Sequence, residues 1–347
     1  MKKIFFSSVL LGLALAACQK NETVGFDQPS DVEQVELTVG VQGASLVTRA
    51  TNVIKGANGE GKVNTLEVFV FDKANNQLDA YSSVSGQTEL TLTCTAGERV
   101  IYAVVNAEDD LTEVATLDQL MAKVSDLKDN ELTGFEMIGK VVKTLPQEDV
   151  VVIDVSRFAA RVVISEVVRD FASTSLQAVD FSVDAIYLTN VATQMNYGYT
   201  MDNTVWYNQF AVSGDMISPF VSEFASLTFD TISDGTLSDS ESYSEEHCFY
   251  AYPNPHYEGE LLDGAEVNAE TRLVVETTLD GVKRYYPIAL PALESNHSYE
   301  IRKLTITRPG SLSPDQKISV SDAQFELNVV DWTTVLVSAT NDGIIEI

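Results

Sequence analysis

The sequence predicts a mostly β protein built from two successive β-sandwiches, with one short helix. Short segments in which apolar and polar side chains alternate recur along the chain, and turns rich in Gly, Asn and Pro separate them. Only one segment shows helical spacing. A chain of 347 residues with 45% hydrophobic residues is long enough for two domains that each bury a core. We place the join between them near residue 156.

The first eighteen residues indicate a secretion signal rather than part of the fold. Two lysines precede the apolar run of residues 4–17, which is short for a membrane-spanning helix. The run ends in LAAC at residues 15–18, which resembles the lipobox at which a bacterial signal peptidase cuts before a diacylated cysteine. We therefore expect a signal peptide with its lipobox over residues 1–18 and lipid on Cys18. The alternative is an ordinary secretory signal in which the cysteine occurs by chance.

Residues 19–49 contain one predicted strand and one isolated arginine. After a polar, acidic stretch, four apolar residues alternate with polar residues or glycine, which predicts a half-buried strand. Arg49 is the only basic residue between Lys20 and Lys55, and small or polar residues without proline surround it. A protease can hold such a segment extended, whereas the alternative is a plain surface arginine in a loop. The alternating apolar residues are Val35, Leu37, Val39 and Val41.

Residues 50–155 are predicted to form the first sandwich. After a glycine-rich loop, apolar or alternating segments predict strands, and residues 64–72 are apolar on both faces. Thr116 and Gln119 form the T-x-x-Q capping box of the one predicted helix, which the helical spacing extends to Leu127. The predicted strands cover residues 64–72, 87–94, 98–107, 135–145 and 148–156.

Residues 156–347 are predicted to form the second sandwich. Asp280 and Gly281 mark the turn of the clearest hairpin in the chain. Residues 195–246 are rich in Tyr, Ser and Asp and give no clear assignment. The last stretch, residues 333–347, is apolar and β-branched, and taken alone it indicates the last strand of its own domain. The predicted strands cover residues 157–168, 177–191, 247–255, 270–291, 297–310 and 325–332.

The charge balance and the missing motifs argue against several functions. With 51 acidic and 22 basic residues, the formal net charge of −29 repels nucleic acid and anionic lipid surfaces. The three histidines are scattered and match no metalloprotease or triad pattern, and no glycine-rich phosphate loop is present. We therefore predict no enzymatic activity, no cofactor, no resident metal and no nucleic-acid partner.

Two clusters and two cysteines leave alternatives open. Five acidic residues between Asp234 and Glu246 form either a calcium site or, as we prefer, a solvated loop. Cys94 and Cys248 are predicted to be buried free thiols rather than a disulfide. Four aromatic residues form either a glycan platform or, as we prefer, part of the strands and core. These are Tyr197, Tyr199, Trp206 and Tyr207.

Several segments, taken in order, resemble one family. LEVFVFD at residues 66–72 is similar to its first mature strand, and VSRFAARVVI at residues 155–164 to the stretch that opens its second domain. YYP at 285–287, NHSYEI at 296–301 and GSLSPD at 310–315 together resemble its most recognisable block. With the lipobox and the segments IYAVVNA, FYAYPNP and NVVDW, these motifs are similar to those of the fimbrillins. Fimbrillins are the FimA- and Mfa-type subunits of the type V pili of Gram-negative anaerobes.

The resemblance implies a fold and a mode of assembly. Both domains of such subunits are transthyretin-like β-sandwiches. The precursor carries lipid on Cys18 and is held at the outer membrane, and a trypsin-like protease then cuts between Arg49 and Ala50. Loss of the propeptide, residues 19–49, removes the first strand and leaves an open groove. The C-terminal strand of another subunit enters that groove, so that an extracellular fimbria grows.

Under this resemblance, residues 333–347 supply the strand that enters another copy. One face of the segment alternates in apolar residues, while Leu336 and Ile344 lie on the opposite phase, so the register stays open. The candidate donor residues are Val335, Val337, Ala339, Ile345 and Ile347.

The expected function is that of a structural subunit of adhesive cell-surface fimbriae. The expected partners are further copies, related fimbrial subunits, the processing protease, the outer membrane through the precursor's lipid, and host proteins or glycans. Stalk, tip and anchor roles stay open within the family. Two alternatives remain: an anchor or tip subunit that is not cleaved, and a surface-anchored lipoprotein that binds glycans.

Overall fold

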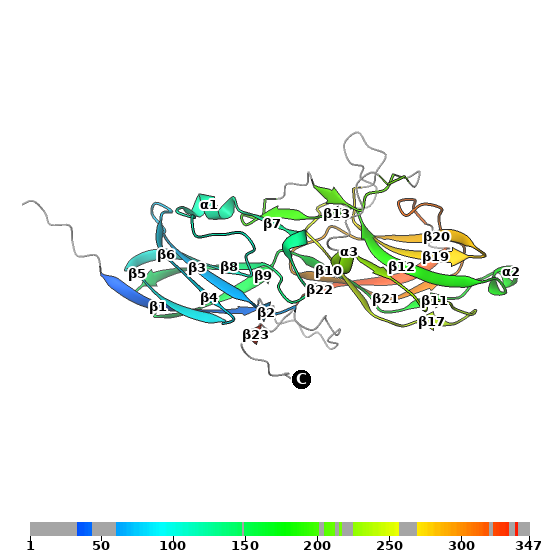
Figure 1. Ribbon diagram of the computed structural model, residues 1–347, viewed down its shortest axis with the longest axis horizontal. Helices are drawn as coiled ribbons and strands as arrows, with labels where there is room; N and C mark the ends of the chain where they lie inside the picture. Colours follow the sequence, from blue (N-terminus) through cyan, green and yellow to red (C-terminus); the bar gives the residue numbers. More distant parts are fainter. Residues whose placement is uncertain are drawn as a thin grey trace, which may run out of the picture. The chain divides into compact units, whose positions relative to one another are not determined.

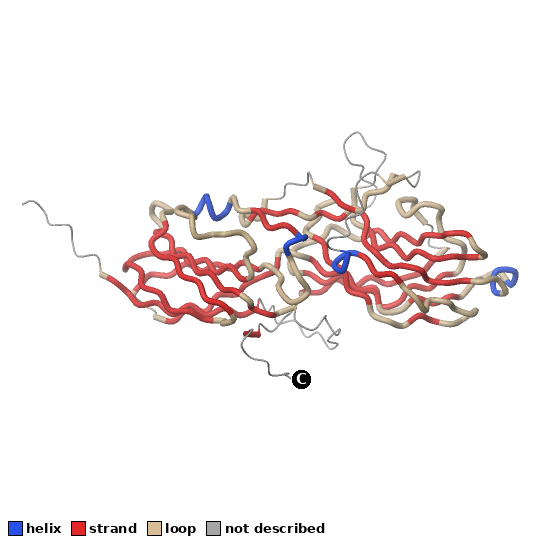
Figure 2. Tube along the Cα trace, viewed as in Figure 1, coloured by secondary structure: helices blue, strands red, loops and turns tan. Residues whose placement is uncertain are grey.

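Strands make up most of the part of the chain that the structure describes (Figures 1 and 2). The chain divides into two units, residues 1–33 and 34–347, and the sheets described below lie in the second unit. The mostly β fold predicted from the sequence is confirmed. This computed structural model describes residues 33–43, 60–147, 149–200, 205–211, 215–216, 225–256, 269–318, 322–332 and 337–338.

Residues 34–157 form a seven-stranded sheet that folds back on itself. Its strand order is β4-β3-β6-β8-β9-β1-β5. β8 and β9 pair only where Met137 and Ile138 meet Arg157 and Ser156, so the sheet is joined there at one corner. The strands are β1 (Gln34–Gly43), β3 (Thr65–Asp72), β4 (Leu78–Ser85), β5 (Glu89–Thr95), β6 (Gly97–Val105), β8 (Met137–Leu145) and β9 (Val150–Arg157).

Alternation along these strands produces the core between the two parts of the sheet. β1, β5 and β9 each turn every second residue inward, as their sequence patterns predict. These side chains meet inward residues of β3, β6 and β8 in one buried apolar cluster. β3 is buried on both faces, because Phe69 and Phe71 on its other face join a second cluster with Leu111, Val114 and Leu120.

The predicted helix is present with its capping box. α1 spans Leu117–Met121, and Thr116 Oγ1 accepts a hydrogen bond from the backbone amide of Gln119 at 3.2 Å. The Gln119 side chain reaches back one residue further than in the standard box, and its Oε1 accepts a bond from the amide of Ala115 at 2.8 Å. Both ends of the box therefore satisfy amides at the start of the helix.

The prediction that this helix extends to Leu127 is wrong. The chain leaves α1 as β7 (Val124–Asp126), followed by the short 3₁₀ turn η1 (Leu127–Asp129). β7 pairs antiparallel with β14 (Gln194–Asn196). The backbone N–H and C=O groups of β7 form hydrogen bonds with a strand that is distant in the sequence, instead of bonds within a helix. The spacing of apolar residues within the segment contains no information about that partner.

The residues from β10 to β22 form two further sheets, whose inward side chains share one large apolar cluster. One sheet has the order β17-β11-β21-β10-β18, with β22 paired to β21, and the other has the order β16-β12-β19-β20. The strands are β10 (Ala160–Ile164), β11 (Val167–Arg169), β12 (Phe181–Thr189), β16 (Phe229–Thr231), β17 (Ser242–Tyr243), β18 (His247–Ala251), β19 (Arg272–Leu279), β20 (Val282–Ala289), β21 (His297–Ile306) and β22 (Ala323–Asp331). The remaining short elements are α2 (Thr174–Gln177), α3 (Ala225–Thr228), β13 (Val191–Ala192) and β15 (Trp206–Tyr207).

The predicted hairpin of residues 270–291 is confirmed. β19 and β20 pair along their whole lengths. Asp280 and Gly281 have φ values of 49° and 74°. Two successive positive values are what a type I′ turn requires, and this turn matches the twist of the strands it joins.

The two groups of sheets are linked through short strands. β7 and β14 join the segment after α1 to the C-terminal part, and β2 (Lys62–Val63) pairs parallel with β23 (Val337–Ser338). The first sheet ends at Arg157, and the next strand begins at Ala160. The division into two domains at residue 156 stays a prediction.

Cys94 and Cys248 are free thiols in different sheets. The prediction that both thiols are free is confirmed, but the prediction that both are buried is confirmed for Cys94 alone, because Cys248 is half-buried. Burial raises the pKa of the Cys248 thiol to about 12, which keeps it protonated at neutral pH. Among the described residues, no helix has the length and apolar character needed to span a membrane.

We expect Gly139→Ala to lower the free energy of unfolding by about 2 kcal/mol. A Cβ atom at this position would lie 2.1 Å from the carbonyl oxygen of Asp154, so β8 would be pushed away from β9 at the corner of the sheet. Urea unfolding followed by circular dichroism measures the loss. Gly40→Ala is the matched control, since its Cβ atom would meet nothing nearer than 3.8 Å. Equal midpoints for the two variants would contradict this role of Gly139.

Candidate functional site

β1 lies between β5 and β9 in the first sheet (Figure 1). It runs antiparallel to β5 over Gln34–Gly40 and parallel to β9 over Thr38–Gly43. Thr38–Gly40 are therefore paired on both sides. Because β1 separates them, β5 and β9 have no direct pairing with each other in the described sheet.

Four aliphatic side chains of β1 point into the core. Leu37 and Val39 are fully buried, and Val35 and Val41 are 7% and 8% exposed. At about 1.5–3 kcal/mol for each buried side chain, they contribute roughly 6–12 kcal/mol, which is an upper estimate. Their inward placement follows the alternation seen in the sequence, while removal of the strand stays a prediction.

Two side-chain hydrogen bonds join the outer face of β1 to its neighbours. The hydroxyl oxygens of Thr38 and Thr91 on β5 lie 2.9 Å apart, and Gln42 Nε2 donates to Asp154 Oδ1 on β9 at 2.8 Å. Both bonds are exposed to water, so each contributes little net stability. Backbone pairing and inward apolar side chains therefore hold β1, and another strand with the same alternation can reproduce both.

Most of the predicted processing and donor residues lie outside the described residues. Val337 is described as part of the backbone of β23, opposite Lys62 of β2. The structure thus brings one residue of the predicted donor segment beside a segment that follows the predicted cut. The residues outside the described ranges are Cys18, Arg49, Ala50, Val335, Ala339, Ile345 and Ile347.

Glu60 is the centre of a buried polar cluster that sequence reasoning missed. Its carboxylate accepts hydrogen bonds from Arg161 Nη1 at 3.0 Å, Tyr250 OH at 2.6 Å and Trp332 Nε1 at 2.9 Å. Its backbone carbonyl accepts a bond from Arg157 Nη2 at 3.1 Å. The Arg157 guanidinium also lies over the Trp332 ring, 4.2 Å from its centroid. The chain is thus fixed at Glu60, eleven positions after the predicted cut.

The sequence contained only part of the signal for this cluster. Arg157 and Arg161 stand in a recognisable motif, but a glutamate in a glycine-rich loop gives no sign of burial, because Glu is rarely buried. Burial lowers the pKa of Arg157 to about 10, against the opposing effect of the Glu60 carboxylate. Arg157 therefore keeps its charge at neutral pH.

A second buried polar cluster lies where β7 meets the C-terminal part. Tyr197 OH donates a hydrogen bond to the Glu136 carboxylate, and the Glu136 amide donates to Asn130 Oδ1 at 2.9 Å. The hydroxyl oxygens of Ser125 and Tyr252 lie 2.5 Å apart. Burial raises the pKa of Glu136 to about 7, against the opposing hydrogen bonds from Ser125 and Tyr197. This carboxyl therefore changes its charge near neutral pH.

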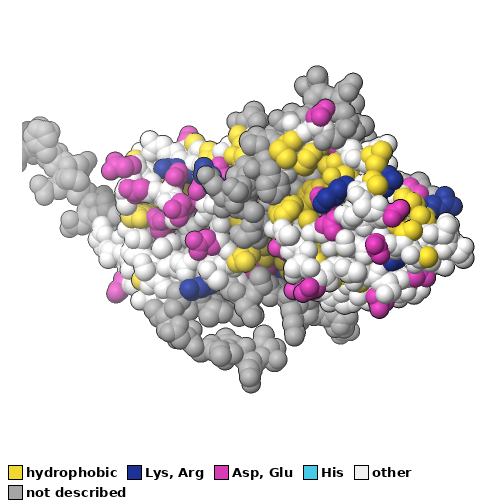
Figure 3. Space-filling view, turned by 45° about the vertical axis from the view of Figure 1, so that its right-hand side comes forward, with side chains coloured by type: hydrophobic (Ala, Val, Ile, Leu, Met, Phe, Trp, Pro, Cys, Tyr) yellow, Lys and Arg dark blue, Asp and Glu magenta, His cyan; other side chains and the backbone are white. Residues whose placement is uncertain are grey.

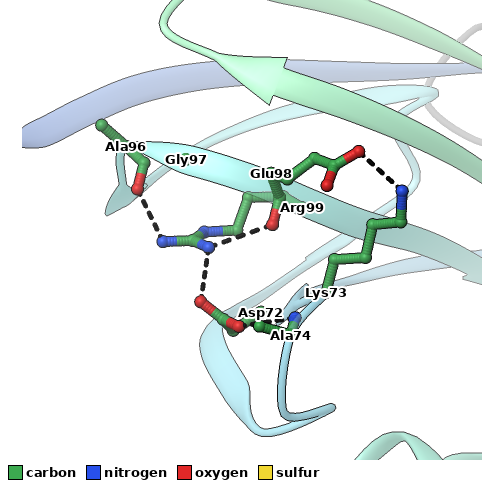
Figure 4. A pocket seen from close by; sticks show the side chains of 7 residues that line it. All are labelled: Asp72, Lys73, Ala74, Ala96, Gly97, Glu98 and Arg99. Atoms are coloured by element: carbon green, nitrogen blue, oxygen red, sulfur yellow. Dashed lines mark hydrogen bonds and ion pairs between the residues drawn. The ribbon is translucent and has the colours of Figure 1, made fainter.

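A shallow hollow of about 350 Å³ lies between the end of β3 and the start of β6 (Figure 4). Arg99 Nη1 lies 2.7 Å from Asp72 Oδ2, and its Nη2 donates to the carbonyl oxygen of Ala96 at 2.7 Å. Lys73 and Glu98 pair at 2.6 Å. Because both cations already have partners, the hollow offers no free charge to a ligand. Arg99 instead ties the end of β3 to the turn between β5 and β6.

The four aromatic residues considered as a glycan platform do not share one surface. Tyr197 is buried in the core. Tyr199 is 45% exposed and lines a hollow of about 450 Å³. Trp206 and Tyr207 are half-buried in β15. Of these four rings, only that of Tyr199 is broadly open to solvent. The preference for strand and core aromatics is therefore confirmed for Tyr197, which lies in the core, and for Trp206 and Tyr207, which lie in strand β15.

The described residues contain no group of three or more His, Cys, Asp or Glu side chains arranged to hold a metal ion. His247 is buried, with Nδ1 2.8 Å from Asp230 Oδ2 and Nε2 2.9 Å from Tyr243 OH. Burial raises the pKa of Tyr243, so the phenol stays protonated and is a poor nucleophile. The three residues join β18 to β16 and β17.

Acidic side chains are spread over the face shown in Figure 3, as the net charge of −29 requires.

We expect the wild-type chain to lose stability relative to Glu136→Gln as the pH rises from about 4.5 to 8. The pKa of Glu136 is about 7 in the folded state against an ordinary 4.5, so folding binds a proton. Stabilisation is therefore complete below the unfolded pKa and is lost as the pH rises through the folded pKa. Glu136→Gln lacks this loss, which is on the order of 3 kcal/mol.

Chemical denaturation at a series of pH values measures this difference. Glu131→Gln, at an exposed position five residues earlier, is the control and should follow the wild-type curve. If the Glu136→Gln and wild-type curves run parallel from pH 4.5 to 8, the buried carboxyl does not titrate as described.

Residues 34–157 match the family model described as major fimbrial subunit protein (FimA). The match begins at the first residue of β1 and ends at the last residue of β9, so it covers the whole seven-stranded sheet. β1 therefore belongs to the region that the family model describes.

One curated relative is a candidate fimbrium tip subunit, Fim1C of Parabacteroides distasonis. The two sequences are 25% identical over 226 residues, which are 57% of this chain and 59% of the relative. The chain thus spans less than two thirds of the length of this relative.

Two solved structures have a similar fold. The fimbrilin FimA of Porphyromonas gingivalis W83 superposes with a TM-score of 0.64 at 15% identity, over 87% of this chain and 98% of the other. A candidate cell adhesion protein of Bacteroides eggerthii superposes with a TM-score of 0.63 at 18% identity, over 87% and 97% of the two chains. At these identities the likeness shows the fold alone. The match to the family model over the first sheet and the shared fold over most of the chain confirm the resemblance found in the sequence: this chain is similar to the FimA-type fimbrial subunits.

Proposed function

We propose that this chain is a structural subunit of adhesive cell-surface fimbriae, assembled after proteolytic removal of β1. The observation that carries the proposal is the position of β1 in both the sheet and the chain. β1 is buried between two other strands, yet it precedes every other described strand in the sequence. A cut at Arg49 falls between β1 and β2, so it would free one strand and leave the rest of the sheet on one continuous chain.

Loss of β1 creates a site that only another strand can fill. The facing edges of β5 and β9 would present unpaired backbone N–H and C=O groups. Beneath them would lie an apolar trough, lined among others by Leu92 of β5 and Ile153 of β9. An extended strand with apolar residues at alternate positions satisfies the backbone edges and the trough together, which is β-augmentation.

The proposed occupant is the segment of residues 333–347 from a second copy. Trp332, the residue before this segment, is buried and bonded to Glu60, so the residue at which the segment begins is held in place. Val335, Val337 and Ala339 supply one apolar face. Insertion of one copy's end into the next copy is a heterologous contact that does not close, so the product is a filament.

The proposed route to the cell surface begins with lipid on Cys18, which anchors the precursor in the outer membrane. A trypsin-like protease then cuts between Arg49 and Ala50. Further copies and related fimbrial subunits are the proposed assembly partners, and host proteins or glycans are the proposed adhesion targets. A tip role is the second candidate, because the curated relative Fim1C is a candidate tip subunit.

We expect Arg49→Ala to block maturation on the cell surface. Arg49 is the only basic residue between Lys20 and Lys55, so its loss removes the site that a trypsin-like protease would use in this stretch. Mass spectrometry of surface fibres should give Ala50 as the N-terminus of the wild-type chain, and the variant should stay in the membrane fraction. Lys55→Ala is the control and should mature normally. A wild-type chain that still begins at Cys18 would point to an uncleaved anchor or tip subunit.

We expect deletion of residues 333–347 to abolish the ladder of polymers on unboiled gels, since the groove would have no donor. Val337→Asp should have the same effect, because a carboxylate would enter the apolar trough. Leu336→Asp, on the opposite phase, is the matched control and should polymerise. A ladder that survives the deletion would remove the donor strand from the proposal, and the reverse result for the two point variants would reverse its register.

A further inference from the structure

We propose that Gly40 sets how tightly β1 is held, and keeps that hold weak enough for another strand to replace it. This inference rests on the proposed function and identifies the residue of β1 that controls its release. Gly40 is the last of the three residues, Thr38–Gly40, that pair with both β5 and β9. A change in strand stability at this position therefore acts on both walls of the groove at once.

No steric requirement explains a glycine here. A Cβ atom at Gly40 would meet only the carbonyl oxygen of Thr88 at 3.8 Å and the Cβ atom of Glu89 at 3.9 Å, which are ordinary contacts. Gly139 and Gly235 differ, since a Cβ atom there would lie 2.1 Å and 1.9 Å from a backbone carbonyl oxygen. The backbone at Gly40 also lies outside the positive φ range that favours glycine.

The surroundings of Gly40 would favour a side chain. Its partner on β9 is Val152, which is 55% exposed, and the next outward residue of that strand, Val150, is 60% exposed. A β-branched residue at position 40 would cover part of this apolar surface on the parallel neighbour, and β-branched side chains pack well on a half-buried strand. Glycine in a strand interior also loses more backbone conformational entropy on folding than any other residue, and it has no side chain to pack. Glycine at position 40 therefore leaves β1 less stable in the sheet than a β-branched residue would.

The test compares Gly40→Thr with Ser83→Thr. Ser83 is exposed on β4, which pairs with β3 and not with β1, and threonine keeps its hydroxyl. Each chain is cut after Arg49 by an arginine-specific protease and mixed with a fluorescent synthetic peptide of residues 333–347. Peptide incorporation is followed with time, and thermal unfolding of the uncut chains is measured alongside.

We expect both variants to unfold at a higher temperature than the wild-type chain, but only Gly40→Thr to take up the peptide more slowly, by roughly fivefold. β4 keeps its partner when β1 leaves, so Ser83→Thr should match the wild-type rate. The inference is overturned if Gly40→Thr incorporates peptide as fast as the wild-type chain, or if it is no more stable.

A wild-type chain that takes up no peptide would count against the proposed function, not against this inference. Hydrogen exchange of the uncut chains then tests the role of Gly40. Gly40→Thr should slow exchange of the Val39 and Val41 amides by the same roughly fivefold factor, and Ser83→Thr should not. Unchanged exchange in Gly40→Thr would overturn the role assigned to Gly40.

Discussion

The pairing of β1 with β5 on one side and β9 on the other is the contact on which the N-terminal sheet depends. β8 and β9 meet only at one corner, and β5 and β9 do not pair directly. The part of the sheet opposite β3, β6 and β8 therefore exists as a surface only while a strand lies in the position of β1. Under the proposed function, this part of the sheet would be completed either by β1 or by another strand in the same place.

The Glu60 cluster explains how the rest of the chain can remain in place if that strand changes. Glu60 is tied to Arg157 at the end of β9, to Arg161 and Tyr250 in the C-terminal part, and to Trp332 before the last segment. None of these contacts involves β1. A buried carboxylate needs such partners, since burying it alone is strongly unfavourable. The proposed donor segment and the chain after the proposed cut are therefore anchored at one point.

The two polar clusters and the aliphatic face of β1 have different physical consequences. The aliphatic face of β1 contacts the core through alternate apolar side chains, which any strand with the same pattern supplies, so under the proposed function the groove would accept a strand of another copy. The hydrogen bonds around Glu60 and Glu136 depend on particular donors and on burial, so they fix the fold without taking part in the exchange. The proposed weak point of β1 at Gly40 precedes the proposed cut in the sequence, and the specific hydrogen bonds of Glu60 follow it.

The sequence by itself determined the strands and their inward faces. Val35 to Val41 alternate, and the Asp280-Gly281 turn has one favoured geometry, because these signals are local. Only the tertiary structure decided the rest. The backbone of Val124–Asp126 pairs with β14 although its spacing indicated a helix, and Glu60 is buried although its loop indicated exposure. The position of β1 between β5 and β9 also depends on the whole sheet. Partners distant in the chain set each of these outcomes, and a local pattern contains no information about them.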